Sequence, residues 1–148
     1  MKLMTWLAAM AVVGCASAAS AESFTTTWTS DAPMVVRAPG TIGGAPAVAA
    51  YFTGVTTATY KSGAVVKANY QCVQWPAAGM GTNTQAICQV QENATDKYSV
   101  VYSCSSDDKS AACWGGLAGT GGKYMGKRGT VSQIGTGASG AGQGAWAD

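Results

Sequence analysis

The clearest pattern in the chain is an alternation of apolar and polar residues with a period of two. It runs through residues 64–75, 84–92 and 97–104, where most of the apolar residues have even numbers and most odd positions hold Lys, Asn, Gln or Ser. Such alternation is typical of strands with one face toward a core. We therefore expect three consecutive strands whose inward face carries Val66, Ala68, Tyr70, Cys72, Ala86, Cys88, Val90, Tyr98, Val100, Tyr102 and Cys104.

Residues 23–29 alternate in the same way and predict a first strand. Phe24, Thr26 and Trp28 lie on one of its faces, and Ser or Thr occupies the other. No segment shows the sustained i, i+3, i+4 apolar spacing of an amphipathic helix. Short runs divided by Gly, Pro, Asn and Asp predict an all-β sandwich or barrel.

The segment that follows the first strand is rich in residues that interrupt strands. Residues 30–46 contain three prolines and three glycines and predict a loop, with a short edge strand at 34–37. Residues 47–60 are apolar and then Thr-rich. They predict either two strands broken at Gly54 or one bent strand.

Glycine dominates the last third of the chain. Residues 113–130 predict a strand, a glycine turn and a second strand, around which the fold is organised. Residues 135–144 are of low complexity and predict a flexible loop. Residues 145–148 predict a last half-strand, with Trp146 turned inward to close the barrel.

The glycine turn also carries a resemblance. Gly119–Tyr124, followed by Gly126 and Gly129, resembles the GGTGKY hairpin of allene oxide cyclase-like and dirigent-like β-barrels, with Thr120 and Gly121 in permuted order. Small secreted bacterial proteins of unassigned function carry it too. The resemblance implies a calycin-type fold, a closed antiparallel β-barrel of about eight strands with a lumen. It also implies a homo-oligomer, since related barrels often form trimers.

The chain begins with a pattern typical of a signal peptide. Lys2 supplies the positive charge, residues 3–13 are apolar but too short to span a bilayer, and residues 19–21 form a small-x-small cleavage site. We therefore expect residues 1–21 to be removed and residues 22–148 to form a single β-barrel domain, periplasmic or extracellular in a bacterium.

A second kind of processing stays open. Residues 12–15 resemble the lipobox of bacterial lipoproteins, in which Cys15 would be lipidated and become the first residue. The protein would then be an outer-membrane lipoprotein. We expect contact with a membrane only in that case, and we favour simple cleavage after Ala21.

The remaining cysteines predict two disulfides, because they are even in number and belong to an exported protein. A hairpin turning near Met80 places residue i opposite residue 160 − i, and a second hairpin closes over residues 105–112. The first choice of pairing is therefore Cys72–Cys88 and Cys104–Cys113. A Cys88–Cys104 bond, which leaves Cys72 with Cys113, is the alternative. The spacing of the cysteines and the lack of His disfavour zinc.

Charge and composition remove several functions. The mature chain would carry eight Lys and Arg, the nine of the full chain less Lys2, against seven acids, so nucleic acid is a poor partner. The absence of His excludes Ser-His-Asp and Cys-His catalysis. No P-loop or Rossmann fingerprint is present, so we expect no cofactor and no metal. Asp107 and Asp108 predict a solvated acidic turn in preference to a calcium site.

A few inward positions carry candidate chemistry. Glu92 is the one acid with inward parity, at the end of a strand. It is a weak catalytic candidate, and we expect a turn residue that faces water. The aromatic residues are core residues first, but they could line an apolar pocket and contact a ligand: Tyr70, Tyr98, Tyr102 and Trp28.

Three functions fit these observations. The favoured one is non-catalytic binding of a small apolar molecule or an envelope protein. The second is a cofactor-free cyclase or isomerase of the allene oxide cyclase or dirigent type, with Glu92 or a tyrosine inside the lumen. The third is a periplasmic hydrolase inhibitor that presents residues 105–112 as a rigid loop.

Overall fold

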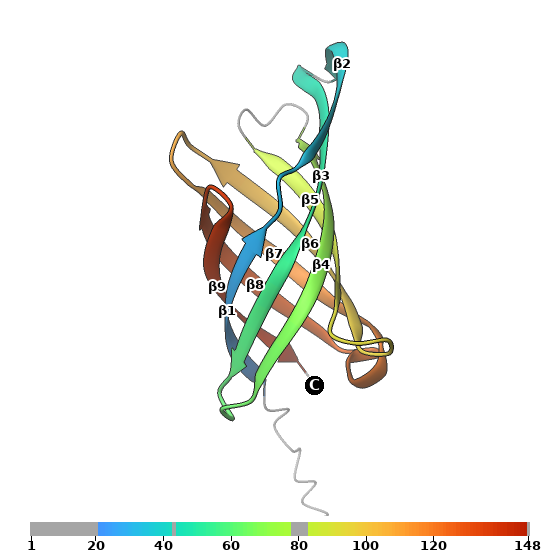
Figure 1. Ribbon diagram of the computed structural model, residues 1–148, viewed down its shortest axis with the longest axis vertical. Coiled ribbons are helices and arrows are strands. Elements are labelled where there is room, and N and C mark those ends of the chain that lie inside the picture. The colour runs from blue at the N-terminus through green and yellow to red at the C-terminus, as the bar shows by residue number, and fades with distance from the viewer. Residues whose placement is uncertain (1–20, 43, 78–82, 148) are drawn as a thin grey trace, which may run out of the picture.

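The computed structural model describes residues 21–42, 44–77 and 83–147 (Figure 1). The predicted targeting segment through residue 20, with Cys15, and the predicted turn at Met80 lie outside these residues. The described elements are β1 (Glu22–Ser30), β2 (Met34–Ile42), β3 (Ala45–Tyr60), β4 (Val65–Pro76), β5 (Thr84–Gln91), β6 (Lys97–Ser106), β7 (Ala111–Gly121), the 3₁₀ turn η1 (Gly122–Tyr124), β8 (Arg128–Thr136) and β9 (Ser139–Ala147).

Eight of the strands close into an antiparallel barrel. Sequential strands pair from β3 to β9, and β1 closes the ring by pairing with both β9 and β3. The prediction of a closed barrel of about eight strands is confirmed. β2 pairs with the first half of β3, and this hairpin extends past the rim at the upper end of Figure 1.

β2 is longer than the sequence predicted. The expected loop over residues 30–46, with its edge strand at 34–37, is instead a strand that continues to Ile42. Its register shifts between Arg37 and Thr41, so Pro39 lies in the irregular part of the pairing. An edge strand tolerates proline there, because no ladder hydrogen bond is lost.

β3 is one strand of 16 residues and is not broken at Gly54. Gly54 lies between Ser30 of β1 and Tyr70 of β4 in the register. A Cβ atom on Gly54 would lie 2.5 Å from the Tyr70 hydroxyl. Glycine is required because the tyrosine ring crosses β3 at this point.

The predicted inward face is confirmed. The buried core holds residues from every strand of the ring, and the even-numbered positions of β4, β5 and β6 contribute Ala68, Cys72, Ala86, Cys88, Val90, Val100, Tyr102 and Cys104. β1 contributes Phe24. Hydrophobic burial on the inside of a ring without free edges stabilises this barrel.

The glycine-rich segment 135–144 is not a flexible loop. It contains the end of β8, a two-residue turn and most of β9, which pairs with β8 on one side and with β1 on the other. Glycine is needed because a Cβ atom at Gly144 would meet Phe24, and one at Gly140 would meet Trp28. The inward position of Trp146 is confirmed, with 2% of the residue exposed.

The glycine hairpin has the predicted order of strand, turn and strand, but the turn comes later than expected. β7 continues to Gly121, and Lys123 and Tyr124 belong to η1 and not to the second strand. Gly122 and Gly126 have positive φ angles of 56° and 78°. These conformations, which favour glycine, reverse the chain here.

Both first-choice disulfides are confirmed. Cys72 is bonded to Cys88, and Cys104 is bonded to Cys113, each pair directly opposite in its strand register. The alternative pairing is wrong, and the four sulfur atoms are not free to bind zinc. Two disulfides indicate an oxidising environment outside the cytoplasm.

Candidate ligand-binding lumen

The interior of the barrel contains a cavity of about 410 Å³. This volume falls within the range of small-molecule sites. Apolar and aromatic side chains form most of its wall, among them Phe24, Phe52, Ala86, Val90, Val100 and Leu117. Alanines are part of the wall too, at Ala50, Ala86 and Ala111, and their small side chains leave room inside the barrel.

All four aromatic residues singled out from the sequence line this cavity: Trp28, Tyr70, Tyr98 and Tyr102. They come from β1, β4 and β6. Burial raises the pKa of Tyr98 and Tyr102 well above the ordinary value. Both phenols therefore stay neutral at physiological pH.

An aromatic plug, defined as Tyr60, Tyr124 and Trp146, fills one end of the barrel. The rings of Tyr124 and Trp146 stack with centroids 4.9 Å apart, and Tyr98 packs edge-on against both, at 5.0 and 5.3 Å. The plug residues do not line the cavity, whereas Tyr98 does. The plug therefore closes the lumen at this end.

Glu92 holds the plug in place. Its carboxylate accepts hydrogen bonds from the Tyr124 hydroxyl and from Lys123 Nζ at 2.6 Å. The hydroxyls of Tyr124 and Tyr60 lie 3.0 Å apart and form a hydrogen bond. The expectation that Glu92 faces water is wrong, because only 8% of its side chain is exposed. It lies behind the plug and is not part of the cavity lining.

The carboxylate of Glu92 raises the pKa of both of its hydrogen-bond partners, Tyr124 and Lys123. Burial, followed by the hydrogen bonds to Glu92 and Tyr60, raises the pKa of Tyr124. Desolvation lowers the pKa of Lys123, but the hydrogen bond and charge of Glu92 outweigh it, so the net shift is upward. Tyr124 therefore stays neutral and acts as the donor in its hydrogen bond to Glu92.

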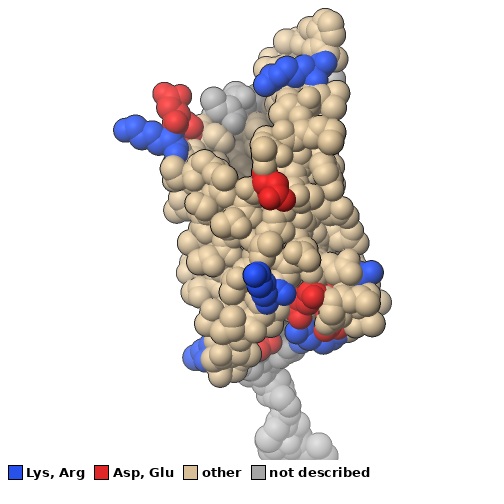
Figure 2. Space-filling model, in the orientation of Figure 1, with Lys and Arg blue, Asp and Glu red and all other residues tan. Residues whose placement is uncertain are grey.

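At the opposite end of the lumen, several of the described lining residues are exposed to solvent. Residues 31–33, 137 and 138 line the cavity and are exposed. They belong to the connection after β1 and to the turn between β8 and β9. Most of the face seen in Figure 2 carries neither acidic nor basic side chains.

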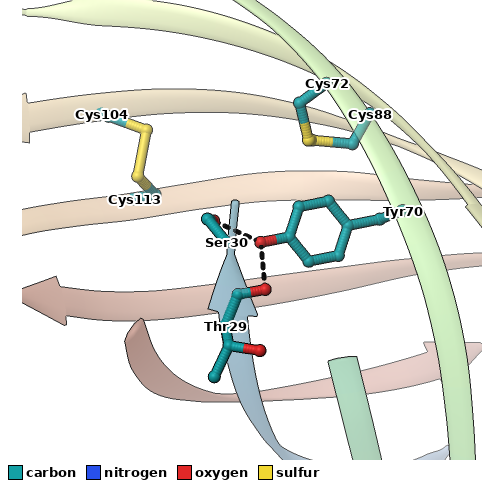
Figure 3. The surroundings of a disulfide bond; sticks show 7 residues. All are labelled: Thr29, Ser30, Tyr70, Cys72, Cys88, Cys104 and Cys113. Atoms are coloured by element: carbon teal, nitrogen blue, oxygen red, sulfur yellow. Dashed lines mark hydrogen bonds between the residues drawn. A yellow bond between two sulfur atoms is a disulfide. The ribbon is translucent and has the colours of Figure 1, made fainter. Parts of the chain in front are cut away.

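Tyr70 braces the wall below this mouth. Its ring reaches from β4 to β1 (Figure 3), where the hydroxyl donates to the Thr29 carbonyl at 3.0 Å and lies 2.5 Å from Ser30 Oγ. Since the phenol proton is used on Thr29, Ser30 is the donor in the second bond. The ring is available to a ligand, but its hydroxyl already has partners in the protein.

Two buried polar atoms of β1 have no such partner. The Trp28 indole nitrogen and the Thr26 hydroxyl are buried and make no hydrogen bond within the described part of the chain. Both residues line the cavity from one face of β1. The alternation of residues 23–29 predicted this shared face, but a pattern in one strand does not reveal whether a donor finds a partner.

The turn between β6 and β7 is shorter than the predicted loop over residues 105–112, because β6 continues to Ser106 and β7 begins at Ala111, so that only residues 107–110 lie between the strands. Asp107 Oδ1 accepts hydrogen bonds from the backbone amides of Lys109 and Ser110. These bonds lower the pKa of Asp107. A turn of this size offers little loop surface to a hydrolase.

Comparisons with protein-family models, with curated proteins and with solved structures found no match. Within the part of the chain that the structure describes, no helix has the length and apolarity needed to cross a membrane. Functional inference therefore rests on the lumen itself.

Proposed function

We propose that the protein binds a small apolar molecule in its lumen without catalysing a reaction on it. The observation that carries this proposal is the cavity of about 410 Å³, lined by aromatic and aliphatic side chains and open at one end. Burial of apolar ligand surface against such a wall supplies the affinity. The aromatic plug limits how deep a ligand can enter.

The binder is favoured over the cyclase because of where Glu92 lies. Its carboxylate is engaged by Tyr124 and Lys123 behind the plug, so it does not meet a molecule in the lumen. We propose, from its glycine hairpin, that the barrel is related to allene oxide cyclase-like and dirigent-like barrels. The residues that carry this resemblance include no catalytic residue of the lumen.

The two disulfides bear on the compartment in which the protein works. They indicate a non-cytoplasmic, oxidising environment. We propose that residues 1–21 are a signal peptide that delivers the barrel to the periplasm or to the extracellular space. A carrier of poorly soluble molecules would be useful in either place.

The test uses a neutral fluorescent probe, N-phenyl-1-naphthylamine, whose emission rises in an apolar site. Ala86→Phe places a ring into the lumen, because Ala86 is buried and lines the cavity. Ile87→Phe changes the neighbouring, half-exposed outward position and is the matched control. We expect the wild type and the control to bind and Ala86→Phe to lose binding while still folding. Equal emission from all three proteins contradicts a lumen site.

A second proposal, self-association, is supported by the outer wall. We define the outer row as five apolar residues that adjoin one another in the strand register, each 40–65% exposed: Met34, Tyr51, Val73, Ile87 and Val101. Single exposed apolar residues are ordinary, but a contiguous row favours an interface. We propose a second copy of this chain as the partner.

Light scattering tests this self-association across a range of concentrations. We expect a mass above that of one chain, and a return to one chain in Ile87→Lys. The lysine adds a charge to the outer row without entering the lumen. A monomer at all concentrations would exclude the homo-oligomer and leave lumen binding untouched.

A further inference from the structure

The hairpin of β2 and the first half of β3 extends past the rim of the barrel (Figure 1). We call it the mouth hairpin and define it as residues 34–41 and 46–51. All of residues 34–41 are exposed, and three large apolar side chains lie among them: Met34 at 65%, Val35 at 42% and Val36 at 66%. Adjoining apolar side chains on an exposed edge strand favour contact with something outside the fold.

These apolar side chains lie on both faces of the mouth hairpin. Val35 is paired with Ala50, which lines the cavity, so Val35 lies on the face that continues the inside of the barrel. Met34 and Val36 alternate with Val35 along the strand and therefore lie on the outward face. A second copy of the chain packed on the outer row would cover the outward face alone. An apolar phase around the hairpin covers both faces at once.

The charge of the mouth hairpin fits the surface of a lipid bilayer. Arg37 is the only charged residue between Asp31 and Lys61 in the sequence. It is exposed and forms no salt bridge with a described residue. A guanidinium group can hydrogen-bond to lipid phosphates while the apolar side chains beside it lie against acyl chains. The mouth hairpin contributes no carboxylate that would repel these phosphates.

The backbone of β2 limits how deep the hairpin can enter. Among the described strands, β2 pairs with β3 alone, so the N–H and C=O groups of its other edge need water or headgroups as partners. The hairpin therefore fits the boundary between headgroups and acyl chains and does not cross the bilayer. Residues 31–33, which directly precede β2, line the cavity. Contact at the hairpin thus brings the mouth of the lumen toward the lipid.

We propose that the mouth hairpin docks the protein on the surface of a phospholipid bilayer, with Val35 and Val36 against acyl chains and Arg37 at the phosphates. The sequence predicts membrane contact only for a protein lipidated at Cys15, whereas this contact needs no such lipid. The proposal goes beyond the proposed function, because it concerns the outside of the barrel and holds with the lumen empty or filled.

The experiment measures co-sedimentation of the protein with vesicles of phosphatidylethanolamine and phosphatidylglycerol. The chain starts at Glu22, so that a lipid on Cys15 cannot account for binding. We expect the wild type to bind and the partition coefficient to fall about tenfold in Val35→Ser/Val36→Ser, because two apolar side chains are lost from the contact. Val65→Ser is the matched control and should bind like the wild type. Val65 is 64% exposed and is paired with Thr59, next to the aromatic plug at the other end of the barrel.

A second variant tests the charge. Arg37→Gln should weaken binding to the same vesicles about fivefold, because one cation near an anionic surface is lost. Lys67→Gln, at an exposed cation of β4, is its control and should bind like the wild type. Equal losses in both variants would indicate a general attraction of cations and would overturn the assignment to the mouth hairpin.

The remaining outcomes also decide the proposal. A folded wild type that does not bind the vesicles overturns it, and equal binding by Val35→Ser/Val36→Ser overturns the place of contact. If the vesicles are not bound but this double variant dissociates an oligomer in light scattering, the hairpin belongs to an interface between copies. Binding of N-phenyl-1-naphthylamine without vesicles should persist in the double variant, so a failure of this proposal can be told from a failure of the proposed function.

Discussion

The hydroxyl of Tyr124 donates a hydrogen bond to the carboxylate of Glu92, which lies 32 positions earlier in the chain. The contact joins η1 to the first residue after β5, and the ring of Tyr124 stacks on Trp146. The end of the lumen is therefore closed by a contact between two turns, the one after β5 and the one after β7.

Loss of this carboxylate should weaken the fold without emptying the lumen. We expect Glu92→Ala to lower the free energy of unfolding by about 2 kcal/mol, because the buried Tyr124 hydroxyl loses a charged acceptor. Urea denaturation measures the change. Glu92→Gln, which retains an acceptor, should cost less, and binding of N-phenyl-1-naphthylamine should persist in that variant. A cyclase that depends on Glu92 would instead lose turnover in Glu92→Gln.

Alkaline pH should destabilise the protein through its buried tyrosines. Burial in the fold raises the pKa of Tyr98, Tyr102 and Tyr124, whereas tyrosine in the unfolded chain has a pKa of about 10. Below that pH the tyrosines are neutral in both states and do not reduce the free energy of unfolding. Above it, the unfolded state releases protons that the folded state retains, so the free energy of unfolding falls, by up to about 1.4 kcal/mol per pH unit for each tyrosine.

Urea midpoints at a series of pH values from neutral to strongly alkaline measure this effect. In Tyr124→Phe, the urea midpoint should fall less steeply with pH above the pKa of tyrosine in the unfolded chain. Tyr51→Phe, on the outer wall, is the control and should leave the slope as it is. A midpoint that does not change with pH in the wild type would contradict the burial of these phenols.

Replacement of the glycines of β9 by larger residues should destabilise the fold. Gly144→Ala places a methyl group against Phe24 and 2.7 Å from the Thr130 carbonyl oxygen. We expect a loss of about 1–3 kcal/mol in the free energy of unfolding. Gly116→Ala on β7 is the matched control, because no atom lies within 4 Å of its added methyl group. Equal unfolding midpoints for the two variants would mean that β9 does not lie against β1 as described.

The disulfides should contribute unequally. In the chain-entropy description, the loss of a disulfide costs more when the loop that it closes is longer. The bonds join residues 16 and 9 positions apart, so replacing the Cys72–Cys88 pair by Ala should cost about 3 kcal/mol and replacing the Cys104–Cys113 pair slightly less. Urea denaturation of the two double variants gives the order, and the reverse order would contradict this ranking.

Much of the barrel wall could be predicted from the sequence because its information is local. Alternation in β4, β5 and β6 identified the inward face. The position of the expected turn fixed the register of the β4–β5 hairpin and placed Cys72 opposite Cys88. A period of two shows which side chains of one strand face the core, and it can be recognised wherever one face of the strand is apolar and the other polar. Four of the aromatic residues that line the cavity, Trp28, Tyr70, Tyr98 and Tyr102, were found in this way.

Apart from the inward position of Trp146, the two ends of the lumen could not be predicted, because contacts distant in the sequence make them. β9 shows little hydrophobic pattern, because three of its nine residues are Gly and three are Ala, and the strand is defined by pairing with β1, more than a hundred residues away. Tyr124 follows a glycine turn, where no periodicity indicates that it is buried. The partnership of Glu92 with Lys123 and Tyr124 likewise joins separate turns.

The central claim is that the lumen holds a small molecule, and native mass spectrometry of the protein taken gently from its own cell envelope tests it most directly. We predict an excess over the polypeptide mass that leaves on collisional activation, and the loss of that excess in Ala86→Phe but not in Ile87→Phe. A wild-type protein that carries only its polypeptide mass under the gentlest conditions would contradict the claim.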